Sequence, residues 1–371
     1  MKMLDPIPEA IAAIQRGEVI IVVDDEDREN EGDFLVAARH ATPEVVNFMA
    51  THGRGLICAP LIEDRCNELD LELMVPSNNA AFETPFTISV DLLGHGCTTG
   101  ISAQDRSKTI QALINPNTQP SELGRPGHIF PLRARRGGVL RRPGHTEAAI
   151  DFSRLAGFEP AGVIVEIMNE DGSMARLPEC RELADKFNLK LVSIADLIEH
   201  RLQNETLIER KAQAEIQTAF GPFNAIIFQQ STNDVEHLAL VKGSWNEGDE
   251  VPIRVHSTSM LGDVFQITDF GKGPALHAAM QKMEAIGHGA IIYINKLRKG
   301  GGLLDELQAY QKRAGTAQPF VAPMDAKDYG IGAQIIRQLG IRNCHVLTNS
   351  DRALGPIGYG LTITQVSKLD I

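Results

Sequence analysis

An acidic segment near the start of the chain holds the first residues that could do chemistry. Seven of the ten residues from 24 to 33 are carboxylates, and they follow directly on the apolar run 19–23. Adjacent negative charges repel one another, and the usual offset is a hard divalent cation held by carboxylate oxygens. The alternative is a solvated acidic turn, which is what most charge runs are. An arginine and a glycine interrupt the run, and a segment that served only to keep the chain soluble would need neither. We therefore predict a functional loop in which Arg28, Glu29 and Asp33 are the residues that act in binding or catalysis.

Two histidines follow Pro-Gly pairs and are well placed for proton transfer or metal binding. His128 and His145 each end a PGH tripeptide, and His145 stands at the start of a predicted helix. One such histidine is more often structural, but Glu166 also falls in an apolar segment, where a carboxylate is costly unless it is paired or used. Glu29 and His145 as ligands, with Glu166 as a base, would make a hard-metal site for acid–base chemistry.

A third segment, residues 98–106, reads TTGISAQDR. Small hydroxyls and a glycine ahead of a predicted helix can present N–H groups to an anion. The competing interpretation is that Ser102 simply caps the helix.

The elements that must position these residues are mixed in type, which predicts an α+β (mixed α/β) fold. In the first half, strands are predicted at 19–23, 55–58, 86–90, 162–167 and 189–194, and helices at 8–16, 102–114, 146–156 and 178–187. In the second half, an antiparallel pair is predicted at 225–229 and 238–241, with further strands and helices after it. The polar segment 203–214 predicts a helix tail or linker, so we place the domains at 1–204 and 205–371.

Composition excludes several classes of protein. The chain has 371 residues and a net charge of −12, which argues against a nucleic-acid binder because phosphate backbones need a basic surface. It has no apolar run long enough for a membrane span, and its start predicts no signal peptide. Five cysteines without CxxC spacing fit reduced thiols in the cytoplasm, with no disulfide framework and no cysteine-based zinc site.

The segments that contain the candidate residues resemble 3,4-dihydroxy-2-butanone 4-phosphate synthase, a family of riboflavin biosynthesis. The similarity runs in order from about residue 3 to 202 and is carried by DDEDRENEGDF (24–34), TTGISAQDR (98–106), RPGHIFPLRA (125–134), GGVLRRPGHTEAAIDFSRLAG (137–157) and PAGVIVEIMNEDGSMAR (160–176). The resemblance implies conversion of D-ribulose 5-phosphate to 3,4-dihydroxy-2-butanone 4-phosphate and formate, by enolisation, dehydration, rearrangement and C–C cleavage. It also implies Mg²⁺ or Mn²⁺ as cofactor and a homodimer with active sites near the subunit interface.

The same resemblance assigns roles at matching positions. Glu29 and His145 would bind the metal, and His128, Glu166 and Asp33 would act in catalysis. The implied substrate contacts are Arg28, Glu29, Asp33, Arg142, Gly144, His145 and Thr146. Each step of the reaction moves a proton near an oxygen whose developing charge a divalent cation can stabilise, so carboxylates and histidines around one metal suit it.

Residues from about 220 to 371 resemble GTP cyclohydrolase II, which is fused to this synthase in many bacteria and plants. The similar segments are 254–265, 301–310, 325–341 and 346–350. Where that family has three zinc-binding cysteines, this chain has Ser259, Phe270 and Lys272; Lys327 replaces an arginine beside the retained Asp325, and 297–300 replaces an EGRG stretch. We therefore expect a degenerate domain that binds no zinc and has no GTP cyclohydrolase II activity.

The sequence leaves three alternative functions open. The chain could be a bifunctional enzyme with a working cyclohydrolase, or a non-catalytic scaffold of the pathway. It could also be an unrelated metal-dependent sugar-phosphate isomerase or aldolase, which would not release formate.

Overall fold

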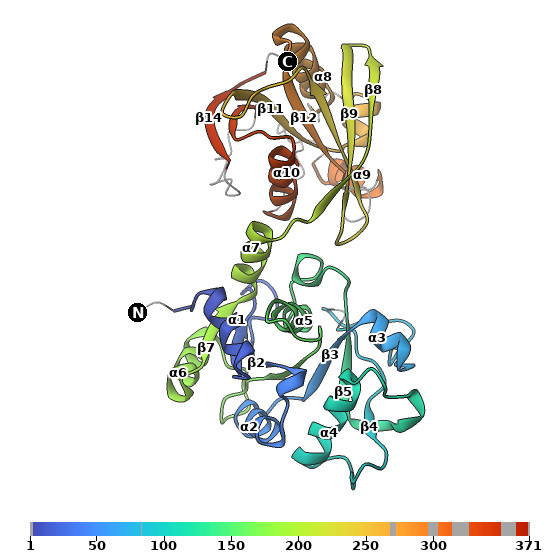
Figure 1. The fold of residues 1–371 in the computed structure, drawn as a ribbon, viewed down its shortest axis with the longest axis vertical. Coiled ribbons are helices and arrows are strands. Elements are labelled where there is room, and N and C mark those ends of the chain that lie inside the picture. Colours follow the sequence, from blue (N-terminus) through green and yellow to red (C-terminus); the bar gives the residue numbers. More distant parts are fainter. Residues whose placement is uncertain are drawn as a thin grey trace. The chain divides into compact units, whose positions relative to one another are not determined.

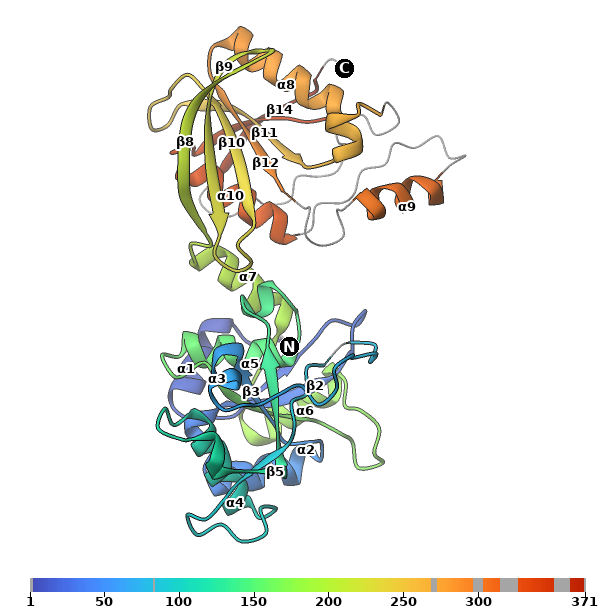
Figure 2. The ribbon, with the colours of Figure 1, turned by 90° about the vertical axis from the view of Figure 1, so that its right-hand side faces the viewer.

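The computed structural model describes residues 3–82, 84–267, 272–295, 303–313, 326–349 and 361–369. The chain forms two compact units, Met1–Arg201 and Leu202–Ile371, and each contains a sheet with helices packed on it (Figures 1 and 2). The expected α+β class is confirmed. Within these ranges, no helix is both long and apolar enough to cross a bilayer.

Unit 1 is built on a seven-stranded mixed sheet in the order β4-β5-β3-β6-β2-β1-β7. Its strands are β1 (Ile20–Val23), β2 (Gly32–Ala37), β3 (Cys58–Ile62), β4 (Val90–Leu92), β5 (Leu123–Ala134), β6 (Gly162–Glu166) and β7 (Lys190–Ser193). β2 lies between β1 and β6 and is antiparallel to both, so the acidic segment becomes the loop of the β1–β2 hairpin.

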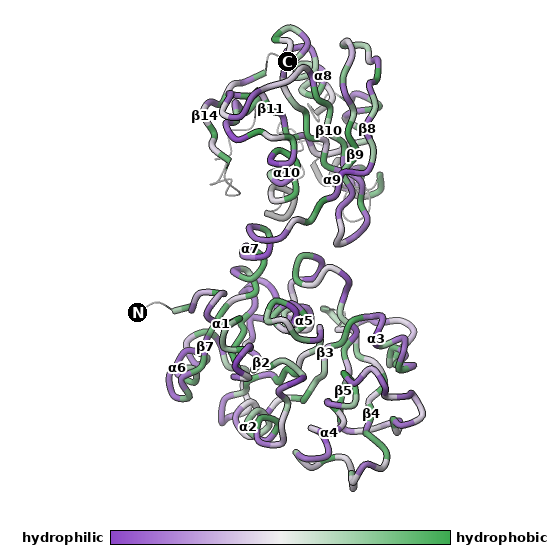
Figure 3. The backbone as a smooth tube through the Cα atoms, viewed as in Figure 1, coloured by the Kyte–Doolittle hydropathy of each residue, from purple (hydrophilic) through white to green (hydrophobic). Residues whose placement is uncertain are grey.

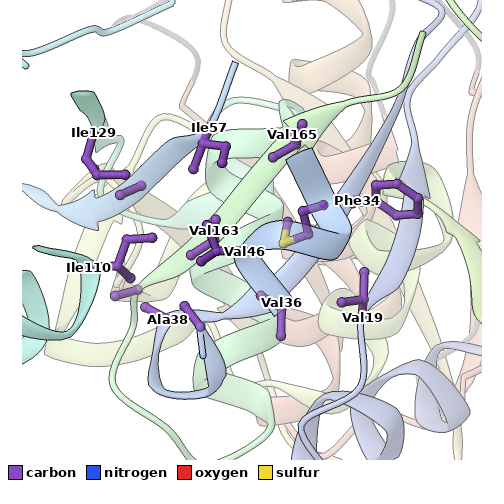
Figure 4. Close-up of a cluster of buried hydrophobic side chains, with 14 of the residues drawn as sticks. Val19, Phe34, Val36, Ala38, Val46, Ile57, Ile110, Ile129, Val163 and Val165 are labelled. Carbon is purple, nitrogen blue, oxygen red and sulfur yellow. The ribbon is translucent and has the colours of Figure 1, made fainter. Parts of the chain in front are cut away.

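The central strands of this sheet are buried on both faces. Successive side chains of a strand point to opposite faces, so Ile21 and Phe34 enter one core while Ile20 and Leu35 enter the other. The first core, shown in part in Figure 4, is covered by α2 (Pro43–Gly53), α3 (Glu63–Glu68), α4 (Ala103–Ile114) and α6 (Leu177–Phe187). The second core is covered by α1 (Ile7–Gln15), α5 (His145–Leu155) and the start of α7 (Ile194–Asn204).

α1 and α6 are amphipathic, and this is why they can form outer layers. α6 is drawn mostly in hydrophilic colours in Figure 3 and buries only Cys180 and Ala184. A helix with one narrow apolar stripe is stabilised mainly by packing that stripe against a sheet.

Two predicted strands of unit 1 are misplaced. The strand expected at 55–58 begins only at Cys58, because α2 ends with Arg54 in a left-handed conformation (φ 68°) and the chain then bends. The strand expected at 86–90 begins at Val90, and Phe86 makes only an isolated bridge to Leu132.

Unit 2 contains a second seven-stranded sheet in the order β14-β13-β11-β12-β10-β9-β8. Its strands are β8 (Ile208–Thr218), β9 (Gly221–Gln230), β10 (Glu236–Lys242), β11 (Glu250–Ser257), β12 (Gly289–Ile294), β13 (Asn343–Leu347) and β14 (Thr362–Ser367). Its helices are a short π-helix (Met260–Val264), α8 (Lys272–Ile286), α9 (Leu303–Arg313) and α10 (Ala326–Gln338). The predicted antiparallel pair is confirmed as β9 and β10.

The segment predicted as a helix tail or linker at 203–214 is largely strand, because β8 begins at Ile208. Most of the β8 side chains are exposed on both faces, so the strand lacks the alternating apolar pattern that sequence reasoning depends on. Its backbone nevertheless pairs with β9 from Ile208 to Thr218, and that pairing decides its structure.

Candidate active site

The acidic loop between β1 and β2 is folded around the carboxylate of Asp24. Its oxygens accept hydrogen bonds from the N–H groups of Glu29 (3.2 Å) and Glu31 (2.9 Å), and Arg28 Nη1 donates to it at 2.6 Å. Arg28 Nη1 also lies 2.5 Å from Glu29 Oε2. The side chains of Asp24, Arg28 and Glu29 are only 1%, 13% and 21% exposed, so these three do not form a solvated turn.

His145 begins α5 and faces this loop. Its Nε2 lies 3.1 Å from the carbonyl oxygen of Val22, and a carbonyl can only accept, so Nε2 carries a proton. Its Nδ1 lies 3.7 Å from Glu29 Oε2 and 3.9 Å from Asp33 Oδ1. One ligand atom each from Asp24, Glu29 and His145 lie within 4.8 Å of one another, which is a spacing that a cation could fill. A metal-binding histidine usually donates its other N–H to a carbonyl in this way.

Asp33 and Glu166 are brought together by strand pairing. They lie directly opposite each other on β2 and β6, so both side chains are on the same face of the sheet. Asp33 is 3% exposed, and its Oδ1 has no hydrogen-bond partner among the described residues. Glu166 is oriented by the N–H of Leu56, which donates to Oε2 at 2.8 Å.

These buried charges shift one another's protonation. The pKa of Asp33 is raised to about 7, and burial is the largest cause. The charge of His145 lowers this pKa, whereas the carboxylates of Glu166 and Glu29 raise it. Burial alone would raise the pKa of Glu29, but the interactions with His145 and Arg28 outweigh it and hold that pKa at about 2. Burial alone would lower the pKa of His145, whereas the neighbouring carboxylates, Asp33 foremost, raise it to about 9.

The loop before α5 places Arg142 beside the start of the helix. Arg142 Nη1 donates to Glu147 Oε2 at 2.8 Å, and Nη2 donates to the carbonyl oxygen of Phe82 at 3.0 Å. A Cβ atom on Gly144 would overlap Arg142 Nη1, so the guanidinium lies directly against the backbone there. Thr146 is buried in the first turn of α5.

His128 lies apart from this cluster. The strand registers place it in the same row of the sheet as Glu166 and Asp33, on β5. With β3 and β6 between β5 and β2, and about 4.8 Å per strand, its backbone is roughly 14 Å from that of Asp33. Its Nδ1 pairs instead with Asp91 Oδ2 at 2.6 Å, and its N–H donates to Asp91 Oδ1 at 2.9 Å.

The segment 98–106 matches the capping interpretation. Ser102 Oγ accepts from the N–H of Asp105 at 3.0 Å, and this caps α4. Asp105 Oδ2 accepts from the N–H groups of Thr98 and Gly100 and from the Thr98 hydroxyl. These donors are therefore already used within the loop and are not available to an anion.

Sequence reasoning missed four residues that organise the site. Asp24 had a signal, because it is the first carboxylate after the strand. Asp91 and Phe82 carried no local pattern, since each contacts its partner only through the fold. Glu147 lies only 5 residues after its partner Arg142, but nothing in the sequence marked it as a buried acceptor. Phe82 joins both candidate arginines: its ring lies 5.3 Å below the Arg28 guanidinium carbon, and its carbonyl binds Arg142.

Comparison with known proteins covers both units. The family model of 3,4-dihydroxy-2-butanone 4-phosphate synthase matches residues 8–200, and that of GTP cyclohydrolase II matches residues 209–368. The chain is 55% identical to riboflavin biosynthesis protein RibBA of Cytophaga hutchinsonii, over 99% of this chain and 93% of that protein. It is 50% identical to RibBA of Bacillus subtilis, over 98% and 93%.

Two solved structures are also similar. A crystal structure of RibBX from A. baumannii, described as a two-domain 3,4-dihydroxy-2-butanone 4-phosphate synthase, has 38% identity and a TM-score of 0.75, covering 99% of this chain and all of that one. A 3,4-dihydroxy-2-butanone 4-phosphate synthase in complex with two magnesium ions has 44% identity and a TM-score of 0.52, covering 54% of this chain and 98% of that one.

The expectation that this chain has no GTP cyclohydrolase II activity is contradicted by the family match to residues 209–368 and by the full-length similarity to proteins named RibBA. It rested on single positions aligned by sequence, whereas a metal site depends on which donors meet in space. Of those positions, Ser259 is described and caps the short π-helix by accepting from the N–H of Gly262. Phe270, Asp325, residues 297–300 and the side chains of Lys272 and Lys327 lie outside the described residues.

The collinear motifs, the buried carboxylate–histidine cluster that they build and the match over residues 8–200 lead to one assignment. The chain belongs to the 3,4-dihydroxy-2-butanone 4-phosphate synthase family and continues into a GTP cyclohydrolase II domain.

Proposed function

We propose that unit 1 converts D-ribulose 5-phosphate to 3,4-dihydroxy-2-butanone 4-phosphate and formate by enolisation, dehydration, rearrangement and C–C cleavage. The observation that carries the proposal is the group formed by Asp24, Glu29 and His145, with the buried Asp33 beside it. Such a group needs either a cation or protons to be stable, and the reaction uses both.

In this proposal Glu29 and His145 bind a divalent cation, Mg²⁺ or Mn²⁺. The residues fit that role: Glu29 supplies a hard carboxylate oxygen, and His145 Nδ1 is aimed at the carboxylates while Nε2 is held by Val22. Support also comes from the related synthase solved with two magnesium ions. A bound cation would supply electrostatic stabilisation of charge that develops on substrate oxygens.

The remaining residues have roles that follow from their surroundings. Asp33 and Glu166 face each other on one side of the sheet and would accept and return protons during enolisation and dehydration. His128, whose tautomer the Asp91 carboxylate would hold, is the third group for proton transfer. Arg28 and Arg142 would bind anionic substrate oxygens, and Gly144 and Thr146 would shape the backbone beside them.

We also propose that the protein is cytoplasmic, acts on this small-molecule substrate without nucleic acid or membrane partners, and works as a homodimer. Five free thiols and the net charge of −12 support the first two statements. The family resemblance alone supports the third, which sedimentation at several protein concentrations would test.

The decisive experiment is formate release from D-ribulose 5-phosphate by the full chain with Mg²⁺. Formate that disappears in His145→Ala, with folding retained by circular dichroism, is the expected result. A different product without formate would indicate the isomerase or aldolase alternative. No turnover with Mg²⁺ or Mn²⁺ would favour the scaffold alternative and overturn the proposal.

A further inference from the structure

We propose that Glu147 is a positioning residue that holds the guanidinium of Arg142 in place to bind the phosphate group of a sugar phosphate. This inference rests on the proposed function only for the choice of ligand. Glu147 is fully buried in the first turn of α5, a place where an unpaired carboxylate would be costly.

Both oxygens of Glu147 are used, and for different partners. Oε1 accepts from the backbone N–H of Arg135 at 3.0 Å, which fixes the carboxylate relative to the end of β5. Oε2 accepts from Arg142 Nη1 at 2.8 Å, with the Arg142 side chain 15% exposed. A fixed, charged acceptor therefore selects one orientation of an otherwise flexible side chain.

The backbone at the start of α5 leaves room for that orientation. The Arg142 guanidinium lies where a Cβ atom of residue 144 would be, and glycine makes this close approach possible. With Nη1 committed to Glu147, Nη2 donates to the carbonyl oxygen of Phe82, a residue that is 42% exposed as a whole. Nη2 thus donates to a neutral oxygen acceptor on an exposed residue, and a phosphate oxygen could replace the Phe82 carbonyl there.

Arg28 supports this location for the anion. Its guanidinium lies over the ring of the same Phe82, so two cationic side chains adjoin one residue at the edge of the site. Arg28 is neutralised by Asp24 and Glu29, whereas Arg142 has one carboxylate partner, Glu147, among the ion pairs of the described residues. Arg142 is consequently the arginine with one N–H group, on Nη2, directed at a neutral acceptor that a phosphate oxygen can replace.

A purely structural role is the competing explanation. In that case Glu147 would stabilise the N-terminus of α5 and satisfy the N–H of Arg135, without acting through Arg142. The two explanations differ in coupling. A residue that acts through Arg142 loses its effect once Arg142 is gone, whereas an independent structural effect persists.

The test is a double-mutant cycle of Glu147→Gln and Arg142→Ala in the full chain. The dissociation constant for D-ribulose 5-phosphate is measured by calorimetry, and KM and kcat are measured by formate release. We expect Glu147→Gln to weaken binding about tenfold and to raise KM with a smaller effect on kcat, as the loss of one charged hydrogen bond predicts. In the Arg142→Ala background, Glu147→Gln should change neither the dissociation constant nor KM further.

Asp151→Asn is the matched control. Asp151 is an equally buried carboxylate on α5, but it accepts from the N–H of Val139 and pairs with Arg201. Its substitution should lower the melting temperature without changing the dissociation constant. If Glu147→Gln does not fold, Glu147→Asp, which keeps the charge at a shorter reach, takes its place in the cycle.

The inference would be overturned if the effects of Glu147→Gln and Arg142→Ala on the dissociation constant multiplied in the double variant. It would also be overturned if Glu147→Gln alone left the dissociation constant unchanged. A wild-type chain that does not bind the sugar phosphate would overturn it too. Binding without formate release would refute the proposed reaction but leave the coupling, and hence this inference, measurable.

Discussion

Asp33 and Glu166 are cross-strand partners on β2 and β6, and the pairing places two carboxylates side by side at one edge of a buried core. Two neighbouring carboxylates repel each other when both are ionised, and burial disfavours their charged forms further. The arrangement costs stability in the metal-free chain and keeps one carboxyl group ready to exchange a proton near neutral pH.

Replacement of Asp33 by Asn should abolish most activity and stabilise the metal-free protein. We expect formate release to fall about 10²- to 10⁴-fold, the usual contribution of a positioned acid or base. The effect on stability should depend on pH, because the pKa of Asp33 is about 7 in the folded chain against an ordinary value of 3.8. Between these values unfolding releases a proton, so Asp33 lowers stability as the pH rises from about 4 to about 7.

Urea unfolding at pH 5 and pH 8 with a chelator present would check this. The Asp33→Asn variant should gain more stability over the wild type at pH 8 than at pH 5. Glu26→Gln, at an exposed position of the same loop, is the control. It should not change the difference in the free energy of unfolding between pH 5 and pH 8. An equal gain at both pH values would contradict the assigned pKa.

Binding of Mg²⁺ should release protons from the site. The pKa of His145 is about 9 in the metal-free chain, so Nδ1 is protonated at neutral pH and must lose that proton to become a ligand. Affinity should therefore fall as the pH falls, with close to one proton released by His145 at pH 7.5. Calorimetry in two buffers of different ionisation enthalpy measures the number, and identical heats in both buffers would argue against His145 as a ligand.

Gly55→Ala should damage the site although it removes no reactive side chain. A Cβ atom at this position would lie 2.5 Å from Glu166 Oε2 and 2.6 Å from its backbone oxygen. The end of β6 would have to move, at a cost of about 1–3 kcal/mol in the free energy of unfolding, and kcat should fall because Glu166 is displaced.

Gly332→Ala, in α10, provides the comparison for that variant. The nearest atom to its added Cβ would be Val255 Cγ1 at 3.5 Å, an ordinary contact. It should be neutral or stabilising by up to about 1 kcal/mol, from helix propensity. Thermal unfolding and formate release of both variants would decide, and unchanged kcat in Gly55→Ala would show that the position of Glu166 is not critical.

Asp91→Asn should lower kcat more than it changes KM. Asp91 holds both the ring and the backbone N–H of His128, so the amide would lose the charge and part of the orientation that sets the imidazole tautomer. We expect a fall in kcat of about 10²-fold if His128 transfers a proton. His95→Asn is the control, since His95 is an exposed histidine that also faces a carboxylate, Glu122; equal effects of the two variants would remove the case for His128.

Local sequence marked several of the candidate residues and predicted much of the architecture. Charge density marked the acidic loop, PGH tripeptides marked His128 and His145, and a carboxylate in an apolar run marked Glu166. Continuous apolar runs predicted buried strands such as β1, because a strand covered on both faces needs apolar residues at every position. Where that condition failed, as in the exposed strand β8, prediction failed as well.

The tertiary structure decided which of these residues meet. Asp33 and Glu166 become neighbours only through the register of β2 and β6, and His145 meets Glu29 because α5 begins beside the end of β1. The pairings of β3 with β5 and β6 separate His128 from that group, and the pairing of β4 with β5 brings Asp91 to it. A sequence specifies types and spacing along the chain, whereas distances between remote side chains follow from strand order and packing, which are properties of the whole core.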